Sequence, residues 1–317
     1  MPNSLGTIFE PVRGRLAVSD DQRQPAGARP HLIHIGHAKT GSSFLRAWFA
    51  DHPEIGYRDG RFAGISGFED VAAKADGVRL RVTSSENFAA PAISGDAPKS
   101  GAFRAAQARV CENLAGLFGG AQILLVTRGY RSMILSSYSQ YVRSGGANSL
   151  EELVADAQRE DPWNYDALLG MYAERFGRDR VMVLPWELLR DSPERFVRQI
   201  EARFGLSHCP PPPQRINRSL SPAEMRWYPR FAAAIGKAPV GTSLKARLAK
   251  RFARLSHSNR LAGAVRLLQR AAPAPPVAPE ALPAAALEPF RGQASSLATD
   301  PLFVPYAADY LNGPRAA

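Results

Sequence analysis

Residues 36–43 combine two glycines, a lysine and three hydroxyl side chains in a pattern suited to binding phosphate. The segment reads Gly-His-Ala-Lys-Thr-Gly-Ser-Ser, with an apolar stretch before it and an apolar, aromatic stretch after it. A buried strand followed by a glycine loop and a helix gathers unpaired backbone N–H groups around an anion. Gly36 and Gly41 have the spacing of a nucleotide phosphate loop. The sequence therefore predicts an anion-binding loop between a strand and a helix.

The lysine of this loop is displaced from the position it occupies in nucleoside triphosphatases. Those enzymes place Lys and then Ser or Thr directly after the last glycine, and a nearby Asp binds Mg²⁺. Here Lys39 precedes Gly41, and Ser42 follows it. The strand predicted over 122–127 ends in Thr-Arg instead of Asp. A site that needs no metal and supplies its own positive charge fits this pattern better.

A second candidate phosphate-binding group follows the strand predicted over 122–127. Arg128 comes directly after it, and Ser136 lies eight residues further on, about two turns into a predicted helix. Parallel α/β folds bind ligands at the carboxyl ends of their strands. Arginine suits a phosphate monoester because its guanidinium makes bidentate, charge-assisted hydrogen bonds. Arg128 and Ser136 are therefore candidates for binding a second phosphate.

These two motifs resemble the cofactor signatures of the sulfotransferases that use 3′-phosphoadenosine 5′-phosphosulfate (PAPS). The resemblance rests on Lys-Thr-Gly-Ser-Ser at 39–43 and on Arg128 with Ser136, and it covers residues 31–235. Segments 183–191 and 217–221 also resemble segments common in bacterial members. The resemblance implies a P-loop architecture. It also implies sulfuryl transfer from PAPS to an acceptor hydroxyl or amine, with release of adenosine 3′,5′-bisphosphate and without a metal.

The resemblance implies a role for each residue of the two motifs. Lys39 would contact the bridging oxygen and offset charge on the departing phosphate. Arg128 and Ser136 would bind the 3′-phosphate. The 5′-phosphate would be bound through the backbone N–H and hydroxyl groups of Thr40, Gly41, Ser42 and Ser43.

The catalytic base that the resemblance implies is a Glu or a His that accepts the proton of the acceptor. In the family it lies near the end of the strand that follows the phosphate-loop unit. Glu86, in Ser-Ser-Glu-Asn-Phe after a strand predicted at 79–83, is the favoured candidate. His37, inside the loop, is the alternative. The geometry of the site decides between them before the pKa does.

Three histidines at 31, 34 and 37 have a spacing that invites a metal-site hypothesis. On a strand this spacing alternates between the two faces, so the three side chains cannot converge on one ion. We therefore predict no metal site here.

Apolar segments with alternating strand-like and helix-like spacing position these motifs. They predict a parallel sheet covered by helices on both faces, that is, a three-layer α/β/α fold. Residues 52–79 are expected to be irregular, a turn is expected at 185–187, and 271–289 is expected to be extended. The predicted division is an N-terminal extension (1–30), a sulfotransferase-like domain (31–235), and a basic helical and Pro-rich segment (236–317) that packs on the same domain through its apolar end at 302–311.

Charge is the main compositional signal. The formal net charge is +11, and residues 237–270 contain nine Lys or Arg and no carboxylate. This basic amphipathic segment is interpreted as a solvated helix pair, as a face recognising an anionic acceptor, or as a contact with anionic membrane lipids. No base-reading module appears, which argues against nucleic acid. Two cysteines, no run of about 20 apolar residues and no signal peptide favour a cytoplasmic protein.

The functional hypothesis is a PAPS-dependent sulfotransferase acting on a carbohydrate, a glycolipid or a related natural product. A P-loop kinase of small molecules or nucleotides is the alternative among enzymes. A non-catalytic polyanion-binding protein is the alternative from another class. The loops that would select the acceptor carry little pattern.

Overall fold

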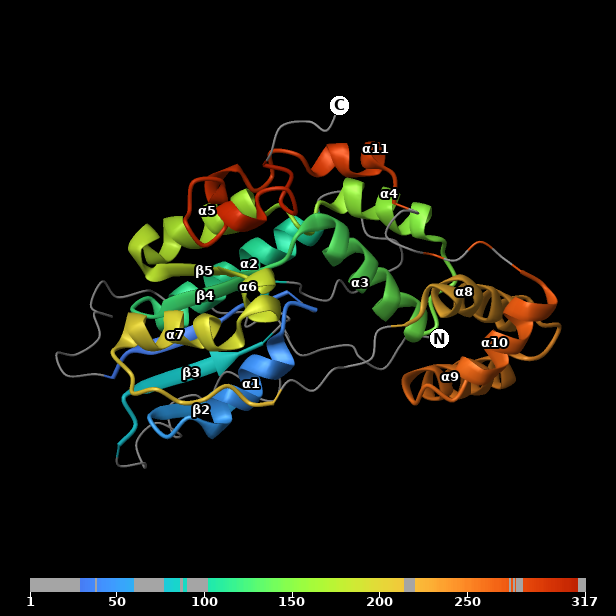
Figure 1. Cartoon of the computed structure of the whole chain (residues 1–317), viewed down its shortest axis with the longest axis horizontal. Coiled ribbons are helices and arrows are strands. Elements are labelled where there is room, and N and C mark those ends of the chain that lie inside the picture. Colours follow the sequence, from blue (N-terminus) through green and yellow to red (C-terminus); the bar gives the residue numbers. More distant parts are fainter. Residues whose placement is uncertain are drawn as a thin grey trace.

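The protein is built on a five-stranded parallel sheet of order β2-β3-β1-β4-β5 (Figure 1). The computed structural model describes residues 29–37, 39–59, 77–85, 88–89, 102–213, 220–273, 275, 277 and 282–312. The strands are β1 (His31–His34), β2 (Ile55–Asp59), β3 (Leu80–Ser84), β4 (Gln122–Thr127) and β5 (Val181–Pro185).

Helices cover both faces of this sheet, which confirms the predicted three-layer α/β/α fold. One face carries α1 (Ser42–Asp51), α6 (Trp186–Asp191) and α7 (Pro193–Phe204). The other carries α2 (Ala102–Phe118) and α5 (Tyr165–Phe176), with α3 (Tyr130–Arg143) and α4 (Leu150–Glu160) beside them. Successive side chains of a strand point to opposite faces. In β4, Leu124 and Val126 therefore join the first layer, and Ile123 and Leu125 the second.

Local signals set the ends of two helices. The hydroxyl of Ser149 accepts from the N–H of Glu152, and the Glu152 carboxylate accepts from the N–H of Ser149, which makes a capping box at the start of α4. The helix α7 ends at Gly205, whose φ of 62° favours glycine.

Three expectations for irregular segments are wrong. Residues 55–59 form the edge strand β2, in which Ile55 is buried and residues 56–58 are partly exposed, so the apolar pattern of an inner strand is missing. The strand β5 runs through Pro185 directly into α6, so there is no turn at 185–187. Part of 271–289 is helical, in α11 (Ala284–Leu287) and in a 3₁₀ turn, η5 (Glu288–Phe290).

The basic segment forms a helix pair, as expected. The helices α9 (Thr242–His257) and α10 (Ala262–Ala271) pack on α8 (Pro222–Lys237), and together they lie at one end of the molecule, away from the sheet (Figure 1). Phe252 and Val265 are the buried apolar residues of α9 and α10. None of the helices in the described ranges is long and apolar enough to cross a bilayer.

The C-terminal segment then returns to the sheet through the short turns η6 (Ser295–Leu297) and η7 (Val304–Tyr306). Phe303 and Tyr310 are buried, which confirms the predicted return of 302–311. The domain boundaries stay a prediction, and residues 1–28 lie outside the described ranges.

Candidate active site at the carboxyl edge of the sheet

The predicted anion-binding loop joins the central strand β1 to α1. Lys39 has a φ of 72°, and Gly41, the N-cap residue of α1, has a φ of 89°. Among the described residues no side chain caps this helix, and its first turn carries no acidic residue. The first backbone N–H groups of a helix have no partner within the helix, and the positive end of the helix dipole lies at the same terminus. This is the arrangement that binds an anion.

The loop is closed by its own hydroxyl groups. The Thr40 hydroxyl donates to the carbonyl oxygen of His37 at 2.6 Å, and the Ser42 hydroxyl donates to the same oxygen at 3.4 Å. Both side chains are buried, whereas Ser43 is exposed. A β-carbon at Gly36 would lie 2.4 Å from the Nε2 atom of His34, so the first glycine is required by a close approach.

Arg128 links the two predicted motifs. It follows β4, the neighbour of β1, and its Nη1 atom donates to the carbonyl oxygen of Lys39 at 2.8 Å, across 89 residues of sequence. Its guanidinium lies 3.8 Å from the ring centroid of Trp186. Burial lowers the pKa of Arg128 from its ordinary value, but a guanidinium keeps its charge in proteins. The site therefore holds a half-buried cation against the phosphate loop.

Two serines extend from Arg128 along one face of α3. The Nε atom of Arg128 donates to the Ser132 hydroxyl at 2.9 Å. Ser136 is half-buried and lies one turn beyond Ser132, because residues four apart in a helix share a face. Sequence reasoning predicted Ser136 but missed Ser132. The signal for it was the repeated spacing of four in Arg128, Ser132 and Ser136.

The backbone around Arg128 is held by a tyrosine. The Tyr165 hydroxyl donates to the carbonyl oxygen of Arg128 at 2.6 Å and accepts from its N–H at 3.3 Å. The ring of Tyr165 also meets the ring of His37 edge-on, with 5.9 Å between centroids. One buried tyrosine thus connects the end of β4 with the loop after β1.

A buried carboxylate supports the turn after β4. The N–H of Gly129 donates to Oε1 of Glu187 at 2.9 Å, and the Tyr310 hydroxyl donates to Oε2 at 2.9 Å. The same hydroxyl lies 3.0 Å from the Thr127 hydroxyl. Burial raises the pKa of Glu187, against the lowering effect of the Gly129 hydrogen bond. Sequence reasoning missed Glu187 and Tyr310, and their only signals were the segment 183–191 and the apolar C-terminal stretch.

Of the two predicted bases, the structure describes only His37. Glu86 lies outside the described residues. His37 is almost fully buried, and its burial lowers its pKa to about 4, so the imidazole is neutral at pH 7. Its Nε2 atom has no hydrogen-bond partner within the described part of the chain. A base works best with a pKa near the operating pH, so His37 is poorly tuned for proton removal.

The other two histidines of the region bind neighbouring strand residues. His31 lies 3.0 Å from the Thr83 hydroxyl through Nε2, and His34 lies 2.8 Å from the Ser84 hydroxyl through Nδ1. Within the described ranges, no group of three or more His, Cys, Asp or Glu side chains could hold a metal ion.

Arg46, in the second turn of α1, is a further cation that sequence reasoning missed. Its Nη2 atom donates to the Ser43 hydroxyl at 3.3 Å, and its Nη1 atom is buried without a hydrogen-bond partner among the described residues. Its charge also contributes, after burial, to lowering the pKa of His34 to about 3. The sequence feature that could have identified Arg46 is that it is the single basic residue of α1.

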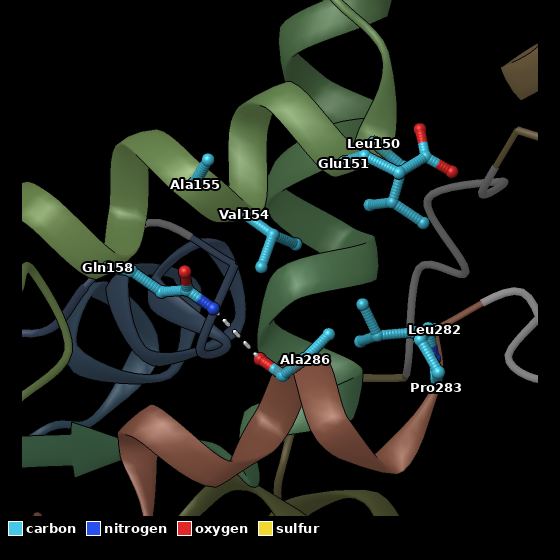
Figure 2. Close-up of a pocket in the computed structure, with 8 residues that line it drawn as sticks. All are labelled: Leu150, Glu151, Val154, Ala155, Gln158, Leu282, Pro283 and Ala286. Atoms are coloured by element: carbon cyan, nitrogen blue, oxygen red, sulfur yellow. Dashed lines mark hydrogen bonds between the residues drawn. The ribbon is translucent and has the colours of Figure 1, made fainter.

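A crevice elsewhere in the fold does not suit phosphate. Figure 2 shows this space of about 210 Å³ between α4 and residues 282–286, where the Gln158 amide donates to the carbonyl oxygen of Ala286 at 3.3 Å. Its lining includes no Lys or Arg and is formed by Leu150, Glu151, Val154, Ala155, Gln158, Leu282, Pro283 and Ala286. The phosphate-binding candidate is the edge formed by β1 and β4, where Arg128 lies against the loop before α1.

Solved structures that are similar to this chain include two sulfotransferases. One is from Alicyclobacillus acidocaldarius, with 18% identity and a TM-score of 0.47, covering 73% of this chain and 96% of that one. The other is mouse sulfotransferase SULT7A1 complexed with PAP, with 13% identity and a TM-score of 0.39, covering 67% and 69%. No protein-family model matches the sequence. No curated protein matches it either.

The buried network below Arg128 yields a stability prediction. Tyr310→Phe should lower the free energy of unfolding by about 2 kcal/mol, because it removes a hydrogen bond to a buried carboxylate. Tyr138→Phe is the matched control, since the Tyr138 hydroxyl donates to the neutral carbonyl of Asn148, and it should cost about 1 kcal/mol or less. Urea unfolding at neutral pH measures both, and equal losses would contradict a special role for the Glu187 pair.

Proposed function

We propose that this protein transfers a sulfuryl group from PAPS to an acceptor hydroxyl or amine. The observation that carries the proposal is the 2.8 Å hydrogen bond from Arg128 to the carbonyl oxygen of Lys39. It joins the second motif to the first at the carboxyl edge of the sheet, where parallel α/β folds bind ligands. A nucleotide with a phosphate at each end of its ribose suits two neighbouring anion-binding groups of this kind.

The residues at this edge fit such a ligand. The N-terminus of α1 has no side-chain cap and no acidic residue in its first turn. The Nη1 atom of Arg46 and the Nε2 atom of His37 are buried without hydrogen-bond partners among the described residues. Leaving a buried donor such as Nη1 of Arg46 unpaired costs free energy, which an anionic ligand would recover.

Each residue has a part in the proposed reaction. PAPS supplies an activated sulfuryl group. Lys39 offsets the charge that develops on the bridging oxygen toward the 5′-phosphate. Because the hydroxyl groups of Thr40 and Ser42 donate to the backbone carbonyl oxygen of His37, the 5′-phosphate is bound mainly by backbone N–H groups and by Ser43. The 3′-phosphate is bound by Arg128 and Ser136, while the Ser132 hydroxyl donates to the carbonyl oxygen of Gly129 and accepts from Arg128.

The proton of the acceptor is proposed to go to Glu86, the favoured base. His37 is the less suitable candidate because its pKa of about 4 makes it a weak proton acceptor at neutral pH. Its buried position next to Tyr165 suits a role in shaping the loop. The proposed acceptor is a carbohydrate, a glycolipid or a related hydroxylated natural product.

Ligand-induced thermal stabilisation tests the cofactor assignment. Adenosine 3′,5′-bisphosphate should raise the melting temperature, because a ligand at about 100 times its Kd adds about 2.7 kcal/mol of stability. ATP with Mg²⁺ should give a smaller shift, since Arg128 stands where a kinase would place a metal-binding carboxylate. Arg128→Ala should abolish most of the bisphosphate shift. Arg178→Ala, at an exposed site in the 3₁₀ turn η3 (Arg178–Arg180), is the control.

The thermal shifts, together with an assay of transfer from PAPS, separate the proposal from its alternatives. A larger shift with ATP and Mg²⁺ would favour a kinase and overturn the PAPS assignment. An Arg128→Ala protein with an undiminished bisphosphate shift would remove Arg128 from the site. Full bisphosphate binding without transfer to any acceptor would indicate the non-catalytic polyanion-binding protein.

A further inference from the structure

The helix α9 presents a row of cations to solvent. Arg247, Lys250, Arg251 and Arg254 are all exposed, and their spacing of three or four residues places them on one side of the helix. The side that faces the protein buries Phe252 and Ser256. The Phe252 ring packs against Tyr228 of α8, with 5.6 Å between the ring centroids. Packing thus fixes which side of α9 faces outward.

The neighbouring helix α10 continues this surface with cations and leucines. Arg266 and Arg270 are exposed and lie one turn apart, and Arg260 is exposed in the connection between the helices. Leu267 is 66% exposed between them. On the opposite side Val265 is buried. We call the exposed cations of α9 and α10 and their connection, together with Leu267, the cationic helix face.

The charge of this face is not compensated locally. Residues 237–270 contain no Asp or Glu. Within the described part of the chain, none of the ion pairs involves a cation of the cationic helix face. A cluster of uncompensated cations creates a positive potential that attracts a negatively charged surface.

Apolar side chains gather on the same helices. Six large hydrophobic side chains are exposed among the described residues, and four of them, Val240, Leu244, Leu267 and Leu268, lie at or within α9 and α10. Cations beside exposed leucines are typical of helices that lie on a bilayer, with the apolar side chains entering the acyl boundary. A nucleic acid or an anionic glycan would match the cations but would leave these leucines in water.

We propose that the cationic helix face docks the protein on an anionic lipid bilayer. Its cations would bind lipid head groups, and Leu267 with its apolar neighbours would enter the interface. The helices that carry this face, α9 and α10, lie at one end of the molecule, away from the sheet (Figure 1). The proposal is independent of the reaction assigned to the edge formed by β1 and β4.

Co-sedimentation of the full chain with vesicles tests this docking. Phosphatidylcholine vesicles that contain phosphatidylglycerol should bind the protein, and vesicles of phosphatidylcholine alone should not. Arg251→Glu with Arg254→Glu should lower the partition coefficient at least about 25-fold, because each cation near an anionic surface contributes about a factor of five. Arg178→Glu with Arg195→Glu is the matched control, with the same change in net charge at exposed sites on the sheet domain.

Leu267→Ser distinguishes a membrane from other polyanions. It should weaken vesicle binding several-fold while heparin and duplex DNA retention stay unchanged, because only lipid offers the leucine an apolar partner. Circular dichroism confirms that each variant is folded. The proposal is overturned by equal binding to the two vesicle types, by equal effects of the two charge-reversal pairs, or by an unchanged affinity of Leu267→Ser for anionic vesicles.

Discussion

Lys39→Ala should lower kcat for sulfuryl transfer at least about tenfold, because a charged hydrogen bond that strengthens in the transition state is lost. It should leave the affinity for adenosine 3′,5′-bisphosphate nearly unchanged. The reason is that Arg128 is held by the backbone carbonyl of Lys39 and not by its side chain. The backbone φ of residue 39 is 72°. Lysine and alanine both carry a β-carbon, so the substitution adds little backbone strain at this angle.

The measurement is kcat with PAPS and an accepted hydroxyl compound, together with a bisphosphate titration of the same protein. Arg178→Ala is the control, since that arginine is exposed in the 3₁₀ turn η3. If kcat of Lys39→Ala stayed within twofold of the parent, Lys39 would have no part in the chemistry. If bisphosphate affinity fell in parallel with kcat, the lysine would act in binding and not in the transition state.

The parts of the fold that were predictable are those with local signals. The strand β4 is a short apolar run because both of its faces are buried, and such a run is visible without any knowledge of its neighbours. The capping box of α4 is visible for the same reason, since its two partners are three residues apart. The edge strand β2 lacks such a pattern, because its polar and glycine residues are held by pairing with β3.

The site divides in the same way. The motif around Lys39 has a fixed spacing, and so does the pair Arg128 and Ser136. Lys39 and Arg128 meet in the structure because they follow the neighbouring strands β1 and β4. Glu187 and Tyr310 have no comparable signal. Their contact spans 123 residues, and it forms because the C-terminal segment packs back on the sheet. A buried Glu looks like any surface Glu until its partners are known.

Acid should destabilise the protein steeply, because burial lowers the pKa of three histidines in and after β1. The pKa values are about 4 for His31, about 3 for His34 and about 4 for His37. Between these values and the unfolded value of 6.5, the unfolded chain binds more protons than the folded one. Stability is therefore fully present above pH 6.5 and is lost as pH falls toward about 4. Each histidine contributes a slope of up to about 1.4 kcal/mol per pH unit.

Urea unfolding from about pH 7 to about pH 5 measures this slope. His31→Gln should reduce the slope of the unfolding free energy with pH by the contribution of about one proton. Gln keeps a side-chain amide near the Thr83 hydroxyl but cannot titrate. Equal slopes for the parent protein and for His31→Gln would contradict the assignment to buried histidines.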